Sequence, residues 1–321
     1  MRKPSKLEET YHLLERMDAG SLSGTDVAVI RSAITGSSGL IIARAAELVG
    51  AGGLRELIQS TVEAFARLMP GGAKSDKNCA AKTAIADALN HLEYLGDEVF
   101  VAGARYVQME PVFGGSVDTA IPLRRACAYG LARIGHPDAH YMLADLLVDA
   151  DPSVRGAAAK ALGCMGTPEG EVMLRLRVLT GEKEAEVLGE CFASLLAMAP
   201  SRSMDFVTRY LDSRDLPVFE CAALAVGQSR SPRAFGVLRD CWEAEFDSHA
   251  RSALVLPIAL VRTDDAFEFL LDVVRRGSSD IASEAVAALS LYADDASVRA
   301  VYEVVNAKGN AQVTRAFESK F

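Results

Sequence analysis

Long apolar runs are missing from this sequence, and their absence limits what it can be. No stretch reaches the roughly 18–20 apolar residues that a membrane-spanning helix needs. The basic start, Met1–Lys6, is not followed by the apolar core of a signal peptide. No linker rich in Pro, Gly or Ser divides the 321 residues, and no alternating β-branched run predicts a strand. We therefore expect a cytoplasmic chain with no membrane partner, folded as one helical domain over residues 1–321 and without a sheet.

Basic residues are outnumbered by acidic ones, 34 to 43, so the formal net charge is −9. A protein that binds nucleic acid generally needs a basic face that displaces counterions from the phosphates. The charge therefore disfavours nucleic acid as a partner, although it does not exclude a local basic groove. The six cysteines contain no CxxC pair and no metal-ligand spacing. We interpret them as reduced core residues.

Motifs for catalysis or metal binding are absent as well. The sequence contains no phosphate-binding P-loop, no Gly-x-Ser-x-Gly elbow and no His-Glu-x-x-His helix. None of the five histidines is followed by glutamate. His136 and His140 could share a metal only across the turn that contains Pro137 and Asp138, and a solvated loop is the favoured interpretation. We expect no catalytic residue, no metal site and no cofactor, although the sequence leaves open whether the protein is an enzyme.

Residues 151–163 contain the pattern that organises the chain. Asp151-Pro152 can open a helix, since the first helical residue needs no N–H partner. Val154, Ala158 and Leu162 then form one apolar stripe, and Gly163 can end the helix in a left-handed cap. The position of Val154 recurs at steps of 31–33 residues, at Leu123, Val187, Val218, Ala250 and Ile281, and less cleanly at Ala81 and Ile41. A helix repeated at this period predicts a solenoid.

A second amphipathic helix lies between successive copies. Its apolar face consists of Met142, Leu143, Leu146 and Leu147 in one repeat. Each repeat is therefore predicted to be an antiparallel pair, an A helix followed by a B helix that carries the pattern of residues 151–163. We expect about eight pairs over residues 25–309, an N-terminal capping helix at about 5–17 and a polar C-terminal cap at 310–321. In this register Cys127 and Cys191 take the place of Ala158 in the core.

The segment Asp151-Pro152-Ser153-Val154-Arg155, with its Ala-rich helix and closing glycine, resembles the HEAT repeat. The short period resembles the variant found in phycobilin lyases. The resemblance covers nearly the whole chain and implies an all-α solenoid, a superhelix of antiparallel helix pairs whose B helices line the concave face. The defining motifs of ankyrin and tetratricopeptide repeats are absent. Solenoids of this type serve many roles, so the resemblance alone does not choose a function.

One insertion breaks the period. The step from Ala81 to Leu123 is 42 residues, and the excess falls in residues 109–118, between an A helix expected over 97–108 and a B helix from near Thr119. Long connections in compact repeats are usually functional or disordered. Pro111 and Phe113 favour an ordered loop here.

Several cations lie near this insertion. Lys82, Arg124 and Arg155 occupy equivalent positions early in successive B helices. One interpretation is a structural ladder in which each pairs with a carboxylate such as Asp151 or Asp118, and for Arg155 we favour it. The other is a basic patch on the concave wall, which stays open for Arg124 and its neighbour Arg125. Acidic residues on later B helices would make the charge of that wall change from positive to negative along its length. Such a pattern suits selective recognition of a protein.

These observations favour a non-enzymatic scaffold that binds a protein or peptide through the concave B-helix face and the 109–118 loop. The candidate binding residues are Gln108, Glu110, Phe113, Asp118, Arg124 and Arg125. Phe113 would anchor in a partner. In the competing interpretation it fills a gap between repeats, while Asp118 caps the next helix and Glu110 accepts from backbone donors. The alternative functions are a HEAT-like nucleic-acid-binding or DNA-repair protein and a lyase-like chaperone for a small ligand.

Overall fold

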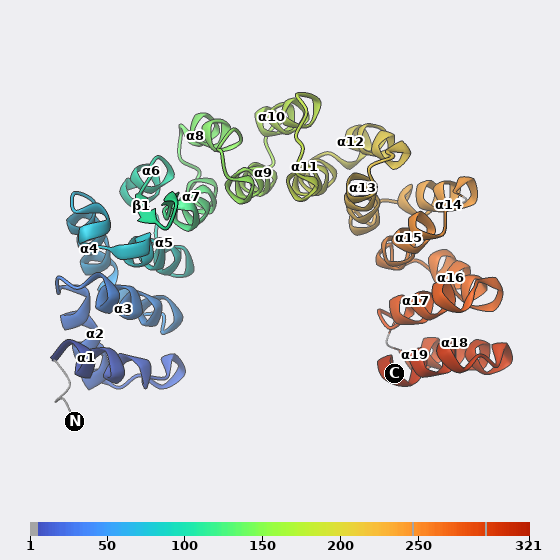
Figure 1. Cartoon of the computed structure of the whole chain (residues 1–321), viewed down its shortest axis with the longest axis horizontal. Coiled ribbons are helices and arrows are strands. Elements are labelled where there is room, and N and C mark those ends of the chain that lie inside the picture. The colour runs from blue at the N-terminus through green and yellow to red at the C-terminus, as the bar shows by residue number, and fades with distance from the viewer. Residues whose placement is uncertain (1–5, 246, 293) are drawn as a thin grey trace. The chain divides into compact units, whose positions relative to one another are not determined.

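The computed structural model describes residues 6–245, 247–292 and 294–321. The chain forms two compact units, one up to Met165 and one from Gly166 onward (Figure 1). The helices of the first unit are α1 (Lys6–Glu15), α2 (Gly24–Ile34), α3 (Gly39–Ala51), α4 (Ile58–Leu68), α5 (Ala80–His91), α6 (Glu98–Ala104), α7 (Ile121–Ile134), α8 (Ala139–Leu146) and α9 (Pro152–Met165).

The second unit is helical throughout its described residues. Its helices are α10 (Pro168–Leu179), α11 (Ala185–Met198), α12 (Pro200–Val207), α13 (Leu216–Gln228), α14 (Ala234–Ala244), α15 (Ser248–Leu260), α16 (Asp264–Arg276), α17 (Ser279–Leu289), α18 (Asp295–Lys308) and α19 (Ala311–Lys320). Short 3-10 turns occur between several of the helices of both units.

The predicted pairing of A and B helices is confirmed. In the first unit α2, α4, α6 and α8 each pack on the helix that follows, and α3, α5, α7 and α9 pack on one another in series. The second unit repeats the arrangement, with α11, α13, α15, α17 and α19 in series as its B helices. The all-α solenoid architecture is therefore present within each unit. The described residues contain four pairs in the first unit and five in the second, where the sequence predicts about eight in all.

The core register is also confirmed. Val154, Ala158 and Leu162 are fully buried, and so are Cys127 and Cys191. Three details differ from expectation. Cys164 is exposed because it lies off the buried stripe of α9. Cys221 and Cys241, also expected in the core, are only partly buried. The left-handed residue after this helix is Gly166, with φ of 65°, whereas Gly163 stays inside the helix.

Small residues let neighbouring B helices approach closely. A Cβ on Gly50 of α3 would lie 2.9 Å from the Ala88 Cα on α5. A Cβ on Gly227 of α13 would lie 2.8 Å from the backbone carbonyl carbon of Pro257 on α15. At both contacts backbone meets backbone with no room for a side chain.

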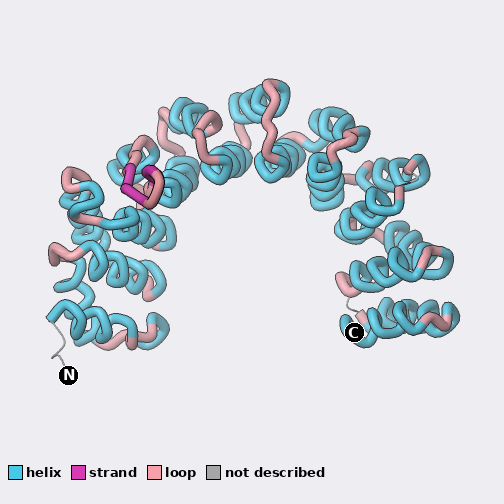
Figure 2. Tube along the Cα trace, in the orientation of Figure 1, coloured by secondary structure: helices cyan, strands magenta, loops and turns pink. Residues whose placement is uncertain are grey.

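The expectation of a protein without a sheet is wrong, because the 109–118 insertion forms a hairpin of two antiparallel strands, β1 (Met109–Val112) and β2 (Gly115–Asp118). The register pairs Met109 with Asp118 and Val112 with Gly115. The turn uses Gly114 at a φ of 88°, a value that glycine adopts without strain. Figure 2 shows the hairpin as the strand segment among the described helices. Its formation ends the preceding helix at Ala104 and delays the next to Ile121.

Candidate functional site

The hairpin is anchored at its base by a buried glutamine. Gln108, which is 4% exposed, precedes β1. Its side-chain Nε2 donates to the Asp76 carbonyl oxygen at 2.8 Å and to Glu110 Oε1 at 2.8 Å. Its carbonyl oxygen accepts from the Thr119 N–H at 2.9 Å, beyond the last strand pair. Gln108 therefore fixes both ends of the hairpin to the turn before α5.

Glu110 forms the second anchor. Its Oε1 accepts from the Asn78 backbone N–H at 2.6 Å and from the Thr119 hydroxyl at 2.8 Å. Asn78 and Cys79 both have the left-handed conformation, with φ of 59° and 53°. Asn adopts it more readily than most residues, so the carboxylate supports a turn whose cost falls mainly on Cys79. Burial alone would raise the pKa of Glu110, but the bonds from Gln108, Thr119 and Asn78 lower it below the ordinary 4.5.

Asp118 and Arg124 join the far end of the hairpin to α7. Asp118 Oδ1 accepts from the Ala120 N–H at 2.9 Å and from the Gln108 N–H at 3.1 Å. Arg124 lies 2.7 Å from Asp118 and 2.8 Å from Asp149. Although burial opposes ionisation of both groups, these bonds lower the pKa of Asp118 and raise that of Arg124. The predicted capping of α7 by Asp118 is not present: its bond goes to the N–H of Ala120, the residue before α7, and among the described residues no side chain caps the first turn of this helix.

The cations of the equivalent B-helix positions are buried, and Lys82 and Arg124 pair with carboxylates as the ladder interpretation predicts, whereas the bonds seen for Arg155 go to backbone oxygens. Lys82 is fully buried and its Nζ lies 2.9 Å from Asp76 Oδ2. Arg155 is also buried and donates to the backbone oxygens of Asp149 and Ala150. Together with Arg124, these side chains are part of the fold, so they do not form an exposed basic patch. Arg125 is the member of the group that solvent reaches.

The tip of the hairpin is apolar and exposed. Phe113 has a relative exposure of 109%, so its whole ring lies in solvent. The interpretation in which Phe113 fills a gap between repeats is therefore wrong. Four neighbouring apolar side chains are also exposed: Val107, Met109, Val112 and Val117. We call these five residues the hairpin apolar set.

A groove of about 380 Å³ lies beside the hairpin base, between the B helices α3 and α5. Small side chains such as Ala84 and Ala88 line it, and Asn78 and Pro122 lie at the hairpin side. Asp87 lines the groove too. Loss of water around its carboxyl raises its pKa above the ordinary value, while His91 and Arg125 act in the opposite direction.

The structure thus separates the six candidate residues into two groups. Gln108, Glu110, Asp118 and Arg124 form one internal network, whereas Phe113 and Arg125 are exposed. Sequence analysis did not identify Asn78, Asp149 or the members of the hairpin apolar set other than Phe113. The glycine pair after Phe113 is a turn signal that could have indicated the hairpin.

Metal-binding geometry was sought among the residues that the structure describes. There, no group of three or more His, Cys, Asp or Glu side chains is placed to hold a metal ion. Instead, His136 Nε2 lies 3.3 Å from Asp97 Oδ2, and His136 Nδ1 accepts a hydrogen bond from the Asp138 N–H at 3.0 Å. Within the same described ranges, no helix is long and apolar enough to cross a membrane.

With this geometry in view, one family match can be placed on the structure. Residues 117–176 match the family model for HEAT repeats. The predicted resemblance to HEAT repeats is therefore confirmed over α7, α8, α9 and most of α10. No curated protein matches the chain closely enough to count as a relative.

Solved structures provide a second comparison. The complex of CpcE and CpcF of phycocyanin lyase from Nostoc sp. contains a chain with 16% identity and a TM-score of 0.40, covering 95% of this chain and 98% of that one. An engineered protein shows 18% identity and a TM-score of 0.41, covering 97% and 94%. Human deoxyhypusine hydroxylase in complex with glycerol shows 16% identity and a TM-score of 0.31, covering 92% and 94%.

Proposed function

We propose that this HEAT-repeat protein is a binding scaffold that holds a protein partner at the hairpin and the adjoining face of α3, α5 and α7. The observation that carries the proposal is the full exposure of Phe113 on a hairpin whose base is fixed by buried polar bonds. Apolar side chains exposed together commonly mark interaction surfaces. Large aromatic residues are frequent anchors of protein interfaces.

The rigid base supports this function on energetic grounds. Association costs free energy when loops must be ordered on binding. The bonds of Glu110, Gln108 and Asp118 hold the hairpin before any partner arrives, which reduces that cost. The neighbouring groove of about 380 Å³ extends the surface onto the B helices, and Arg125 and Asp87 supply charges of opposite sign at its edge.

The burial of the other cations weighs against the nucleic-acid alternative. A strand of phosphates would need several exposed lysines or arginines in a row. Lys82, Arg124 and Arg155 are instead committed to internal bonds. For a lyase-like chaperone of a small ligand, the hairpin and its groove supply no specific supporting contact.

Site-specific photocrosslinking in the native host tests the proposal. A benzoylphenylalanine at position 113 should give one discrete protein adduct, identified by mass spectrometry. The matched control is position 141, because Tyr141 on α8 is an exposed aromatic residue outside the hairpin. Equal adducts at both positions, or none at 113, would contradict the proposal.

A further inference from the structure

The second unit contains a cavity that is unrelated to the hairpin. It has a volume of about 480 Å³ and lies among α14, α15, α16 and α17. Its walls include Trp242, Phe269 and Arg251. The two rings meet edge to face, with centroids 5.7 Å apart and an interplanar angle of 88°. Cavities of this size, with apolar walls and a few polar groups, are typical ligand sites.

Arg251 is the unusual residue of this cavity. It is half-buried, and its Nε donates to the Glu245 carbonyl oxygen at 2.7 Å. Its guanidinium lies 5.7 Å from the Trp242 ring centroid. Among the described residues no carboxylate pairs with it, whereas the two other partly buried arginines of this unit, Arg175 and Arg177, both form ion pairs. Within the part of the chain that is described, this guanidinium therefore contacts a carbonyl oxygen and an aromatic ring but no opposite charge.

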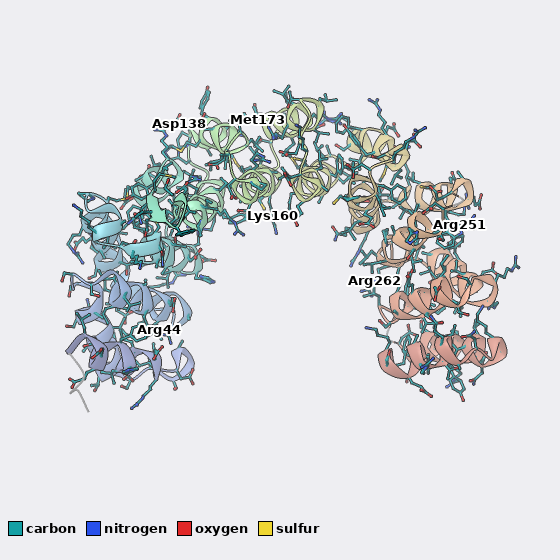
Figure 3. The ribbon with its side chains drawn as sticks, in the orientation of Figure 1. Arg44, Asp138, Lys160, Met173, Arg251 and Arg262 are labelled. Atoms are coloured by element: carbon teal, nitrogen blue, oxygen red, sulfur yellow. The ribbon has the colours of Figure 1, made fainter. Side chains whose placement is uncertain are left out.

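Two further hydrogen-bond donors belong to residues that line this cavity, the Trp242 indole N–H and the Ser248 hydroxyl. Among the lining residues the carboxylate is Asp272, and it is already paired with Arg276 at 3.0 Å. Figure 3 labels Arg251 on α15. The cavity thus combines a cation that has no carboxylate partner among the described residues, N–H and O–H donors, and aromatic walls.

We propose that this cavity binds a small aromatic anion, a ring that carries a phosphate or carboxylate group. The anionic oxygens would accept from Arg251, with the indole N–H and the Ser248 hydroxyl as additional donors. A guanidinium suits this role because its N–H groups match the geometry of carboxylate and phosphate oxygens. The ligand ring would pack against Trp242 and Phe269, where edge-to-face or offset contacts are favourable.

The chain offers its own reporter, because Trp242 is the only tryptophan in the sequence. The probe is phenyl phosphate, with phenol supplying the ring alone and inorganic phosphate supplying the anion alone. Tryptophan emission and isothermal titration calorimetry are followed together, so that binding without a fluorescence change is still detected. We expect saturable binding of phenyl phosphate that is at least about tenfold tighter than that of either half-probe, or about 1.4 kcal/mol.

Variants separate a charge effect from a structural one. Arg251→Gln should weaken phenyl phosphate binding at least tenfold, and Arg251→Lys should recover part of it because the charge is kept. Arg299→Gln is the control, since this arginine on α18 is exposed and does not line the cavity, and it should change binding less than threefold. Circular dichroism melting establishes that each variant is folded. Equal affinity for phenol and phenyl phosphate, unchanged binding in folded Arg251→Gln, or no saturable binding by calorimetry would overturn the proposal.

Discussion

The Glu110 Oε1 atom accepts a hydrogen bond from the Asn78 backbone N–H at 2.6 Å. This bond joins strand β1 to the left-handed turn before α5, across 32 residues of sequence. It makes the hairpin part of the helical stack. Because the anchor is a buried carboxylate, the stability of the hairpin base should depend on its ionisation.

Acidification should therefore loosen the hairpin. The pKa values of Glu110 and Asp118 are lower in the folded state than their ordinary 4.5 and 3.8. A carboxyl group whose pKa is lower in the folded state stabilises the fold at pH values above its unfolded-state pKa. This stabilisation is lost as the pH falls through the folded-state pKa. We expect the hydrogen-exchange protection factors of residues 108–119, corrected for the intrinsic exchange rate at each pH, to fall below about pH 4.5.

Glu110→Gln tests the origin of this dependence. The amide keeps an acceptor oxygen but cannot titrate in this range, so the free energy of unfolding should fall less steeply below pH 4.5 than in the wild type. Glu56→Gln, at an exposed position on the 3-10 turn before α4, is the control. Identical pH profiles for wild type and Glu110→Gln would show that Glu110 does not contribute.

Two adjacent arginines should differ sharply in their effect on stability. Arg124→Ala leaves Asp118 and Asp149 without their buried partner, and breaking such a pair typically costs about 3–5 kcal/mol. Arg125→Ala removes an exposed side chain and should change the free energy of unfolding by less than about 0.5 kcal/mol. Urea unfolding of the two variants compares them directly. Equal losses would contradict the assignment of Arg124 to the internal network.

The close approach of α13 and α15 predicts the effect of a single methyl group. Gly227→Ala should cost roughly 1–3 kcal/mol, because the new Cβ meets the Pro257 backbone. Gly236→Ala on α14 is the matched control: nothing lies within 4 Å of its added Cβ, so it should stabilise by about 0.5–1 kcal/mol. Thermal melting distinguishes them, and a neutral Gly227→Ala would mean that the helices can separate without cost.

The sequence predicts the helix pairs better than it predicts the hairpin, for physical reasons. The apolar stripe of Val154, Ala158 and Leu162 recurs at a nearly constant step, and repetition strengthens a weak local signal. The strands β1 and β2 are only four residues long and contain Pro111 and Gly115, so no two-residue period develops.

The candidate site was predictable in part. An interrupted repeat identifies residues 109–118 as exceptional, and Phe113 and Arg125 are exposed as a binding site requires. The anchoring partners were not predictable, since Asn78 and Asp149 lie 32 and 25 residues from the residues that they contact. Polar and charged residues near an insertion can serve as contacts or as supports, and only burial distinguishes the two roles.

The most direct test of the scaffold proposal measures binding and stability in the same variant. Phe113→Ala combined with Arg125→Ala should weaken binding of the partner identified by crosslinking at least about tenfold, or about 1.4 kcal/mol. Its melting temperature should remain almost that of the wild type, because both side chains are exposed. Tyr141→Ala should change neither quantity. A large loss of stability with unchanged partner affinity would contradict the account and place the binding site elsewhere.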